Sequence, residues 1–241
     1  MKHIIAVIMV MFIVFSSSCL ADKNVTLNPV GESTQSLRYK VVDSGIDYWT
    51  DSIGTKEVFA FIAIKNEEKK KAIYLDSGHF DFENDNGKIM NNYSSIIYKA
   101  PDVINPGETG YFYVSSMEVP DISHGVNLIA QFSLQEAGYK VPSYEISETK
   151  LSWKKELGRT TGKFRGRIHN NTSKDDDIVN VVVVFKDSNK KVLWIDHAFV
   201  NDLFSGSTLG FDIDMMFATP NLKKGAVKSF KTIAKPDYYQ W

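Results

Sequence analysis

The sequence predicts an all-β protein made of two tandem antiparallel β-sandwiches, which follow a short N-terminal signal segment. Three observations support this prediction. The chain repeats itself at an interval of about one hundred residues, each copy consists of short apolar runs between turn residues, and no segment after residue 21 has sustained helical spacing. The 241 residues, 43% of them hydrophobic and 24% charged, suffice for two domains with their own cores.

The N-terminus has the pattern of an export signal. Residues 4–15 form an uninterrupted apolar run that follows Lys2. A membrane span needs roughly 20 apolar residues, whereas the core of a signal peptide needs about 7–15. We therefore expect residues 1–21 to be a signal segment and the mature chain to contain no membrane helix.

The sole cysteine, Cys19, follows this run directly and can form no disulfide within the chain. Its position after Ser17 and Ser18 resembles that of the lipidated cysteine of bacterial lipoproteins, although Ser16 stands where that family prefers Leu. The resemblance implies a membrane anchor of two or more acyl chains, which is enough for stable attachment. The alternative is ordinary signal cleavage after Ala21, which would remove Cys19.

The rest of the chain reads as one unit written twice. Matching residues keep their order in both copies, and their separation falls from 104 to 100 residues in two steps that lie between apolar runs. The matched pairs are Trp49 and Trp153, Asn66 and Asn170, Phe82 and Phe185, Gly110 and Gly210, and Gly125 and Gly225. We place a linker at residues 22–36, a first domain at 37–142 and a second domain at 143–241.

Each copy contains about seven short segments rich in Val, Ile, Phe and Tyr, separated by Gly, Pro, Asn and Asp. The Asn86-Gly87 pair after one such segment predicts a hairpin with a type I′ turn, which requires positive φ at both residues. Seven short strands in about 100 residues are typical of an antiparallel sandwich of the immunoglobulin type. We therefore predict two tandem immunoglobulin-like β-sandwich domains.

Three patterns of the first copy occur in the order found in a known family. One strand ends at Asn66, a strand with alternating aromatics at residues 80–84 runs into residues 85–88 (DNGK), and residues 106–108 (PGE) precede an aromatic strand. Together they resemble the FxLYD-type domains of bacterial surface lipoproteins. The resemblance covers both copies, although the second has SGST where the first has PGET. It implies an immunoglobulin-like fold, a surface location and no chemistry of the domain's own.

One loop is repeated in both copies, as PDISHG at residues 120–125 and PNLKKG at residues 220–225. Each copy contains a capping residue, an aliphatic residue and a final Gly, so we predict one helical turn that leads into the last strand. A ligand-binding loop would be expected to diverge between copies. We therefore interpret this loop as scaffold.

No residue pattern predicts a catalytic, metal-binding or cofactor site. The histidines stand singly, and the acidic run at residues 175–177 is typical of a solvated loop. Residues 81–87 match a calcium loop only in part, because Gly87 is seventh where that loop needs Gly sixth. Residues 206–210 (GSTLG) have Thr where a nucleophile elbow requires Ser. We expect no enzyme; the alternative is a metal-dependent hydrolase whose carboxylates converge from separate loops.

Comparison of the two copies indicates where a partner could bind, because alternate side chains of a strand point to opposite faces of its sheet. In the second copy the outward positions of two strands are charged: Lys163, Arg165, Arg167, Asp212 and Asp214. If the two strands are neighbours, opposite charges cover this face. The matching positions of the first copy are apolar, and its candidate interaction face consists of Phe59, Phe61 and Phe112.

Two interpretations of this apolar face remain open. In the first, the second domain or the segment 22–36 covers it, with Val182 and Val184 as a matching apolar surface. In the second, the face is exposed and docks a protein or ligand partner. The aromatic tail at residues 238–241 raises the same choice, and we expect it to fold back on its own sheet.

The predicted function is that of a non-catalytic exported protein that acts as an interaction module for an unknown protein or ligand. We expect Cys19 to anchor it in the membrane at the cell surface or envelope; without lipidation it is secreted. The alternative within this class is a solute- or stress-sensing lipoprotein that works with a membrane partner. A net charge of −1 argues against a nucleic-acid partner, since phosphates require clustered Lys and Arg.

Overall fold

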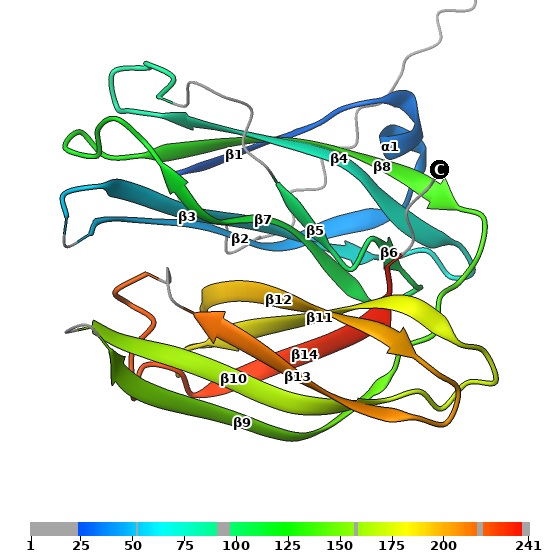
Figure 1. Cartoon of the computed structure of the whole chain (residues 1–241). Helices are drawn as coiled ribbons and strands as arrows, with labels where there is room; N and C mark the ends of the chain where they lie inside the picture. Colours follow the sequence, from blue (N-terminus) through cyan, green and yellow to red (C-terminus); the bar gives the residue numbers. More distant parts are fainter. Residues whose placement is uncertain (1–23, 52, 91–96, 157–158, 216–218, 238–241) are drawn as a thin grey trace, which may run out of the picture.

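The computed structural model describes residues 24–51, 53–90, 97–156, 159–215 and 219–237. Their strands form four sheets that pair into two sandwiches, stacked one on the other (Figure 1). The predicted all-β class and the two tandem β-sandwich domains are confirmed. The signal segment, Cys19 and the residues 238–241 lie outside the described residues. No helix within the described ranges is long and apolar enough to cross a membrane.

Domain 1 consists of two four-stranded sheets, with strand orders β1-β8-β4-β6 and β2-β3-β7-β5. Strand pairing is antiparallel except between β1 and β8, which run parallel. The elements are β1 (Val25–Pro29), α1 (Glu32–Ser36), β2 (Tyr39–Thr50), β3 (Lys56–Asn66), β4 (Ala72–Glu83), β5 (Tyr98–Ala100), β6 (Val103–Ile104), β7 (Thr109–Glu118) and β8 (Asn127–Ala137).

Domain 2 consists of two three-stranded antiparallel sheets, with strand orders β13-β10-β9 and β12-β11-β14. By position along the chain, β9, β10, β11, β13 and β14 repeat β2, β3, β4, β7 and β8. No described strand of domain 2 repeats β1. The elements are β9 (Glu145–Glu156), β10 (Arg159–His169), β11 (Asp176–Lys186), β12 (Val192–Leu203), β13 (Thr208–Met215) and β14 (Ser229–Pro236).

The segment 22–36 is not the linker that the sequence predicted. Its residues include β1, which pairs with β8 from Val25 opposite Leu128 to Pro29 opposite Phe132. The side chains of Val25 and Leu27 pack against the core of domain 1, as the alternation of VTLNP allows. Residues 24–36, the described part of the segment, therefore belong to domain 1.

The duplication is clearest at two buried asparagines, Asn66 and Asn170, which are both fully buried. Asn66 Nδ2 donates to the carbonyls of Lys71 and Ile104, both at 2.9 Å. Asn170 Nδ2 makes the matching pair of bonds, to Lys174 at 2.8 Å and to Leu203 at 3.0 Å. Such bonds replace the water that a buried amide loses. The predicted match between these residues is confirmed.

The hairpin turn after β4 recurs after β11. The Asn84 side chain accepts the N–H groups of residues 86 and 88, and the Asp187 side chain accepts those of residues 189 and 191. Only Gly87 in the first turn and Lys190 in the second have positive φ, at 77° and 66°. The hairpin was predicted correctly, but the type I′ turn was wrong, because Asn86 does not adopt positive φ.

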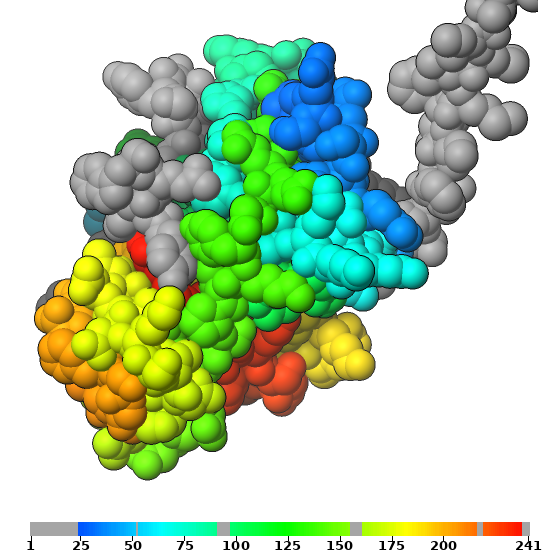
Figure 2. All heavy atoms as spheres, turned by 90° about the vertical axis from the view of Figure 1, so that its right-hand side faces the viewer, coloured from blue at the N-terminus to red at the C-terminus, as the bar shows by residue number. Residues whose placement is uncertain are grey.

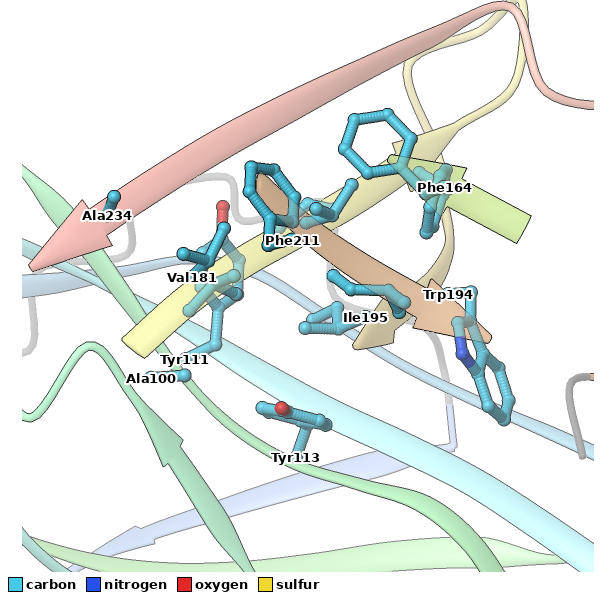
Figure 3. Close-up of a cluster of buried hydrophobic side chains, with 14 of the residues drawn as sticks. Ala100, Tyr111, Tyr113, Phe164, Val181, Trp194, Ile195, Phe211 and Ala234 are labelled. Atoms are coloured by element: carbon cyan, nitrogen blue, oxygen red, sulfur yellow. The ribbon is translucent and has the colours of Figure 1, made fainter. Parts of the chain in front are cut away.

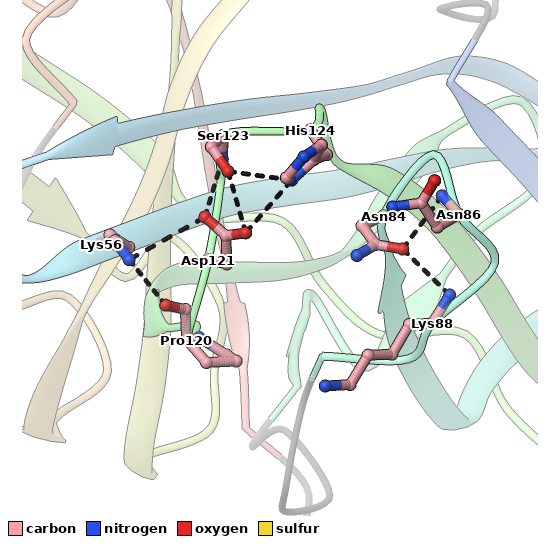
Figure 4. A network of polar contacts seen from close by, with 8 residues as sticks. All are labelled: Lys56, Asn84, Asn86, Lys88, Pro120, Asp121, Ser123 and His124. Carbon is pink, nitrogen blue, oxygen red and sulfur yellow. Dashed lines mark hydrogen bonds and ion pairs between the residues drawn. The ribbon is translucent and has the colours of Figure 1, made fainter.

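The repeated loop also differs from its prediction in part. At residues 119–125 the Asp121 carboxylate accepts the N–H of Ser123 at 2.9 Å and closes a turn (Figure 4). Ile122 packs on the core of domain 1, and Gly125 has φ 74°. The aliphatic contact and the glycine were predicted correctly. The helical turn was wrong, because side-chain bonds of the Asx type hold the loop instead.

The alignment of the two copies made from the sequence agrees with the strand pairing for β3 and β10. For β7 and β13 it is shifted by one residue. Phe61 pairs with Tyr113, and its match Arg165 pairs with Asp212. Tyr113 therefore corresponds to Asp212, and Phe112 corresponds to Phe211. Because a slip of one residue exchanges the two faces of a strand, Phe112 points into the core of domain 1, where it is fully buried.

The match between Trp49 and Trp153 is wrong for the same reason. Trp49 pairs with Glu57 on β3, whereas Trp153 pairs with Gly162 on β10, one position beyond the residue that corresponds to Glu57. Trp153 therefore packs inward, where it would meet a methyl group placed on Gly162 at 3.2 Å. Trp49 instead packs 6.3 Å from the ring of Trp194 in domain 2.

Candidate functional site: the seam between the domains

The outer face of the β2-β3-β7-β5 sheet lies against the β12-β11-β14 sheet of domain 2 (Figure 1). We call this contact the seam. Buried residues of both domains form one continuous apolar cluster across it. The members from domain 1 are Phe59, Phe61, Ala63, Ala100, Tyr111 and Tyr113, none more than 3% exposed. In Figure 3 the rings of Tyr111 and Tyr113 lie between β7 and the strands of domain 2.

Domain 2 contributes valines and one tryptophan to the seam. Val182 and Val184 are fully buried, so the predicted matching apolar surface is confirmed. The indole of Trp194 stacks on Phe59 with ring centroids 4.8 Å apart. Gly45 leaves room for this arrangement, because a Cβ at that position would lie 2.8 Å from the ring of Phe61.

The candidate interaction face Phe59, Phe61 and Phe112 is therefore not an exposed docking surface. Phe59 and Phe61 are each 2% exposed beneath domain 2, and Phe112 lies inside domain 1. The interpretation that the second domain covers this face is correct, and the docking interpretation is wrong. The physical reason is that three or more aromatic rings on an open sheet gain most by excluding water against a second apolar sheet.

Polar contacts fix the rim of the seam at four places. Asp47 accepts hydrogen bonds from Thr219 Oγ1 at 2.5 Å and from Asn221 Nδ2 at 2.9 Å. The second copy of the repeated loop thus holds domain 1, a role that the first copy does not share. Elsewhere Lys235 Nζ lies 2.5 Å from Glu108, with Lys235 only 1% exposed.

A third contact joins aromatic and titratable groups. The hydroxyl of Tyr113 lies 2.5 Å from His197 Nδ1, and the ring of Tyr98 lies 4.8 Å from the imidazole. Burial lowers the pKa of His197. Burial also raises the pKa of Asp196 to about 6, although it accepts hydrogen bonds from the His197 backbone and the Trp194 indole. At this end of the seam burial thus favours the neutral forms of His197 and Asp196.

A carboxyl pair closes the same end of the seam. Burial raises the pKa of Asp102 to about 7; Lys99, 3.8 Å away, opposes the shift, and the nearby Asp237 carboxyl of domain 2 adds to it. Two carboxyls that face each other cannot both ionise cheaply. Contact between Asp102 and Asp237 is therefore most favourable when Asp102 carries a proton.

A groove opens at the other end of the seam, and we call it the seam groove. It encloses about 450 Å³ and is lined by both domains. Its apolar lining includes Phe59 and Phe61, and its polar lining includes Asp47, Asp187, Ser188, Asn221 and the lysines Lys191, Lys223 and Lys228. The sequence did not predict this groove, because its residues meet only when the two domains pack together.

The other residues singled out in the sequence form no site. His169 bonds to Thr208, and the carboxylate of Asp176 accepts a bond from the Tyr144 hydroxyl. The calcium-like residues 81–87 form the end of β4 and its hairpin. Among the described residues no group of three or more His, Cys, Asp or Glu side chains is placed to hold a metal ion.

The charged outer face predicted for domain 2 is confirmed. Arg165 and Asp212 are cross-strand neighbours, and their charges lie 3.3 Å apart. Lys163 bridges Asp212 at 2.9 Å and Asp214 at 3.4 Å. This face meets water and shields the sheet from further association.

Comparisons with known proteins do not assign the chain to a family. No family model and no curated protein matches it. Among solved structures, it is similar to the N-terminal CBM22-1-CBM22-2 tandem domain from Paenibacillus barcinonensis Xyn10C, with 10% identity over 86% of this chain and 89% of that chain and a TM-score of 0.19. A likeness this distant does not bear on function.

Proposed function

We propose that the protein is a non-catalytic exported binding module whose two domains act as one unit. The seam groove is its contact site for an anionic ligand or an acidic segment of a partner protein. Cys19 anchors the molecule in the membrane. The observation that supports this proposal is the groove itself, which combines an apolar lining with three lysines and requires both domains.

The charges of the groove favour an anionic partner. Its two carboxylates already accept hydrogen bonds from the protein, Asp47 from the loop of domain 2 and Asp187 from its own hairpin. By contrast, the ammonium groups of Lys191, Lys223 and Lys228 make no hydrogen bond or ion pair with any described residue. Three unpaired lysines around an apolar surface are suited to an acid with an apolar body.

A crosslinking experiment tests the groove. A photoreactive residue at exposed Ser188 should capture a partner in cells, and the double change Lys223→Glu and Lys228→Glu should abolish that capture. The matched control Lys70→Glu reverses an exposed lysine of domain 1 outside the groove lining and should leave the capture intact. Capture that survives reversal of both groove lysines would show that the groove is not the contact site.

The anchor has a separate test. Cys19→Ala should release the protein from the membrane fraction, because the acyl chains need the thiol. The measurement is the partition of the protein between membrane and soluble fractions, with Ser18→Ala as the control. A wild-type protein that is soluble and begins at Asp22 would contradict lipidation.

A further inference from the structure

The equivalent strands β8 and β14 differ in what lies at their outer edge. Phe82 pairs with Leu128 in domain 1, and Phe185 pairs with Phe230 in domain 2, so Leu128 and Phe230 hold the same place. The chain also crosses each edge at the same point. The N–H of Val30 donates to the carbonyl of Phe132 at 2.8 Å, and the N–H of Tyr144 donates to that of Ala234 at 3.0 Å.

In domain 1 the edge is closed by the parallel strand β1. The N–H of Leu128 donates to the carbonyl of Asn24 at 2.7 Å, and Leu128 and Ala130 are fully buried. The apolar side chains that close this edge are those of Val25 and Leu27, at alternate positions of β1.

In domain 2 no strand of the described residues pairs with the same edge. The residues before Tyr144 come directly from the end of β8 in domain 1, so they cannot run along β14. Phe230, in the place of buried Leu128, is 39% exposed although its ring lies 4.9 Å from Phe164 of the core. Figure 2 shows red atoms from the C-terminal part of the chain at the surface between the domains.

The backbone at this edge has unused hydrogen-bonding groups. The N–H of Asp237 donates to Ile178 on β11, so the odd-numbered residues of β14 bond toward β11. The even-numbered residues therefore direct their N–H and C=O groups away from β11, as the bond from Tyr144 to Ala234 shows. Those of Phe230 and Thr232 have no partner among the described residues. Such an edge is a template for another strand.

The lysine beside this edge, Lys231, indicates which charge a strand that binds here would carry. Thr26 of β1 lies opposite Ile129, and the residue in the place of Ile129 is Lys231. Lys231 is exposed and makes no hydrogen bond or ion pair with a described residue. Burial, and after it the nearby charge of Lys186, lower the pKa of Lys231, and the nearby carboxylate of Glu108, which is paired with Lys235, partly opposes this shift. A cavity of about 370 Å³ lies beside Lys231.

We propose that the open edge of β14 binds an extended segment of a partner protein as a parallel strand. The segment has two apolar side chains at alternate positions, which cover Phe230, and an acidic side chain between them, which meets Lys231. Domain 1 shows the geometry, with β1 in the equivalent position. This site is separate from the seam groove, so either can fail without the other.

Peptides based on residues 24–30 (NVTLNPV) provide the probe. The full mature chain is titrated with this peptide, with its Thr26→Glu form and with its Thr26→Lys form, and amide hydrogen exchange is followed. The Thr26→Glu peptide should bind about tenfold more tightly than the parent and slow exchange at Phe230 and Thr232. The Thr26→Lys peptide should bind more weakly than the parent. Lys231→Glu in the protein should reverse this order.

A proline variant tests the backbone contact. Thr232→Pro removes an outward N–H without removing a bond to β11, so the protein should stay folded and lose peptide binding. Its counterpart Ala130→Pro should instead destabilise domain 1, because there β1 occupies the edge. Equal binding of the acidic and basic peptides, or binding that Thr232→Pro leaves unchanged, would overturn the proposal. So would a concentration-dependent dimer that Thr232→Pro abolishes, since a second copy would then be the occupant.

Discussion

The outer face of β2-β3-β7-β5 and the outer face of β9-β10-β13 are the same surface of a duplicated fold with opposite chemistry. At equivalent positions, Phe61 and Tyr113 in domain 1 become Arg165 and Asp212 in domain 2. The first pair is buried in the seam, and the second pair forms an ion pair in water. A sheet face of this fold is therefore free to be apolar or charged, and what covers it determines which.

The difference also explains why the two domains form one body. Exposure of the apolar face of domain 1 to water would be unfavourable. Domain 2 covers this face with Val182 and Val184 of its β12-β11-β14 sheet. Burying aromatic side chains contributes about 1.5–3 kcal/mol each. The seam is thus held mainly by the hydrophobic effect, while contacts such as Asp47 with Thr219 set its alignment.

The largest effect expected from this comparison comes from exchanging the residues. Phe61→Arg gives domain 1 the residue of domain 2 and places a cation in the seam, where Phe61 is 2% exposed. We expect a loss of about 3–5 kcal/mol in the free energy of unfolding, from lost packing and an unpaired buried charge. Urea denaturation measures it.

The reverse change, Arg165→Phe, is the control. Arg165 is exposed, so the change should alter stability by no more than about 0.5 kcal/mol while lowering solubility. Similar losses for both variants would mean that the two faces are not distinguished by burial.

A smaller effect is expected where the domains agree. Asn66→Ala and Asn170→Ala each leave one buried and one partly buried carbonyl without their amide donor. We expect each to cost about 2–3 kcal/mol, since an unsatisfied buried group costs about 1–3 kcal/mol. Thermal unfolding followed by circular dichroism would show the two losses side by side. A large loss in only one domain would contradict the equivalence of the two networks.

The smallest effect depends on pH. The folded-state pKa of Asp102, about 7, lies above its ordinary value of 3.8, so its contribution to stability is present at low pH and is lost as pH rises through 7. Asp102→Asn keeps the neutral form. It should raise the melting temperature at pH 8 by roughly 2–4 °C, about 1 kcal/mol, because the amide avoids the ionisation of a buried carboxyl.

At pH 4 the same variant should match wild type. The control is Asp202→Asn, which changes an exposed carboxylate of domain 2 and should leave the melting temperature at pH 8 unchanged. A stabilisation by Asp102→Asn that is as large at pH 4 as at pH 8 would exclude the carboxyl pair as its cause.

The duplication and the sheet faces could be predicted because they depend on local patterns. Alternation assigned Phe61 and Arg165 to the outer faces of their sheets, and both positions are as predicted. The alignment of β7 with β13 could not be predicted to the residue. A deletion of one residue in the preceding loop shifts the alignment by one position but hardly changes the composition of that loop. That shift placed Phe112 on the wrong face and left out Tyr111 and Tyr113.

Contacts between distant segments were the second limit. β1 is five residues long and ends in Pro29, so its pattern alone could not be told from a linker. Its strand identity depends on β8, more than ninety residues later. The seam groove and the role of Trp194 were missed for a similar reason. They depend on contacts between the two domains, and the other copy has no matching residue that would have drawn attention to them. What a sequence comparison within one chain reveals is the repeated part, and the sites described above lie where the copies differ.

The parallel strand β1 has a mechanical consequence for the whole molecule. Val25, already fixed to β8, follows Cys19 by only six residues, and an extended chain gains at most about 3.5 Å per residue. If Cys19 carries the proposed lipid anchor, the membrane surface therefore lies within about 21 Å of this edge of domain 1. Such a short tether would keep this edge close to the membrane and restrict the orientations that the two domains can adopt.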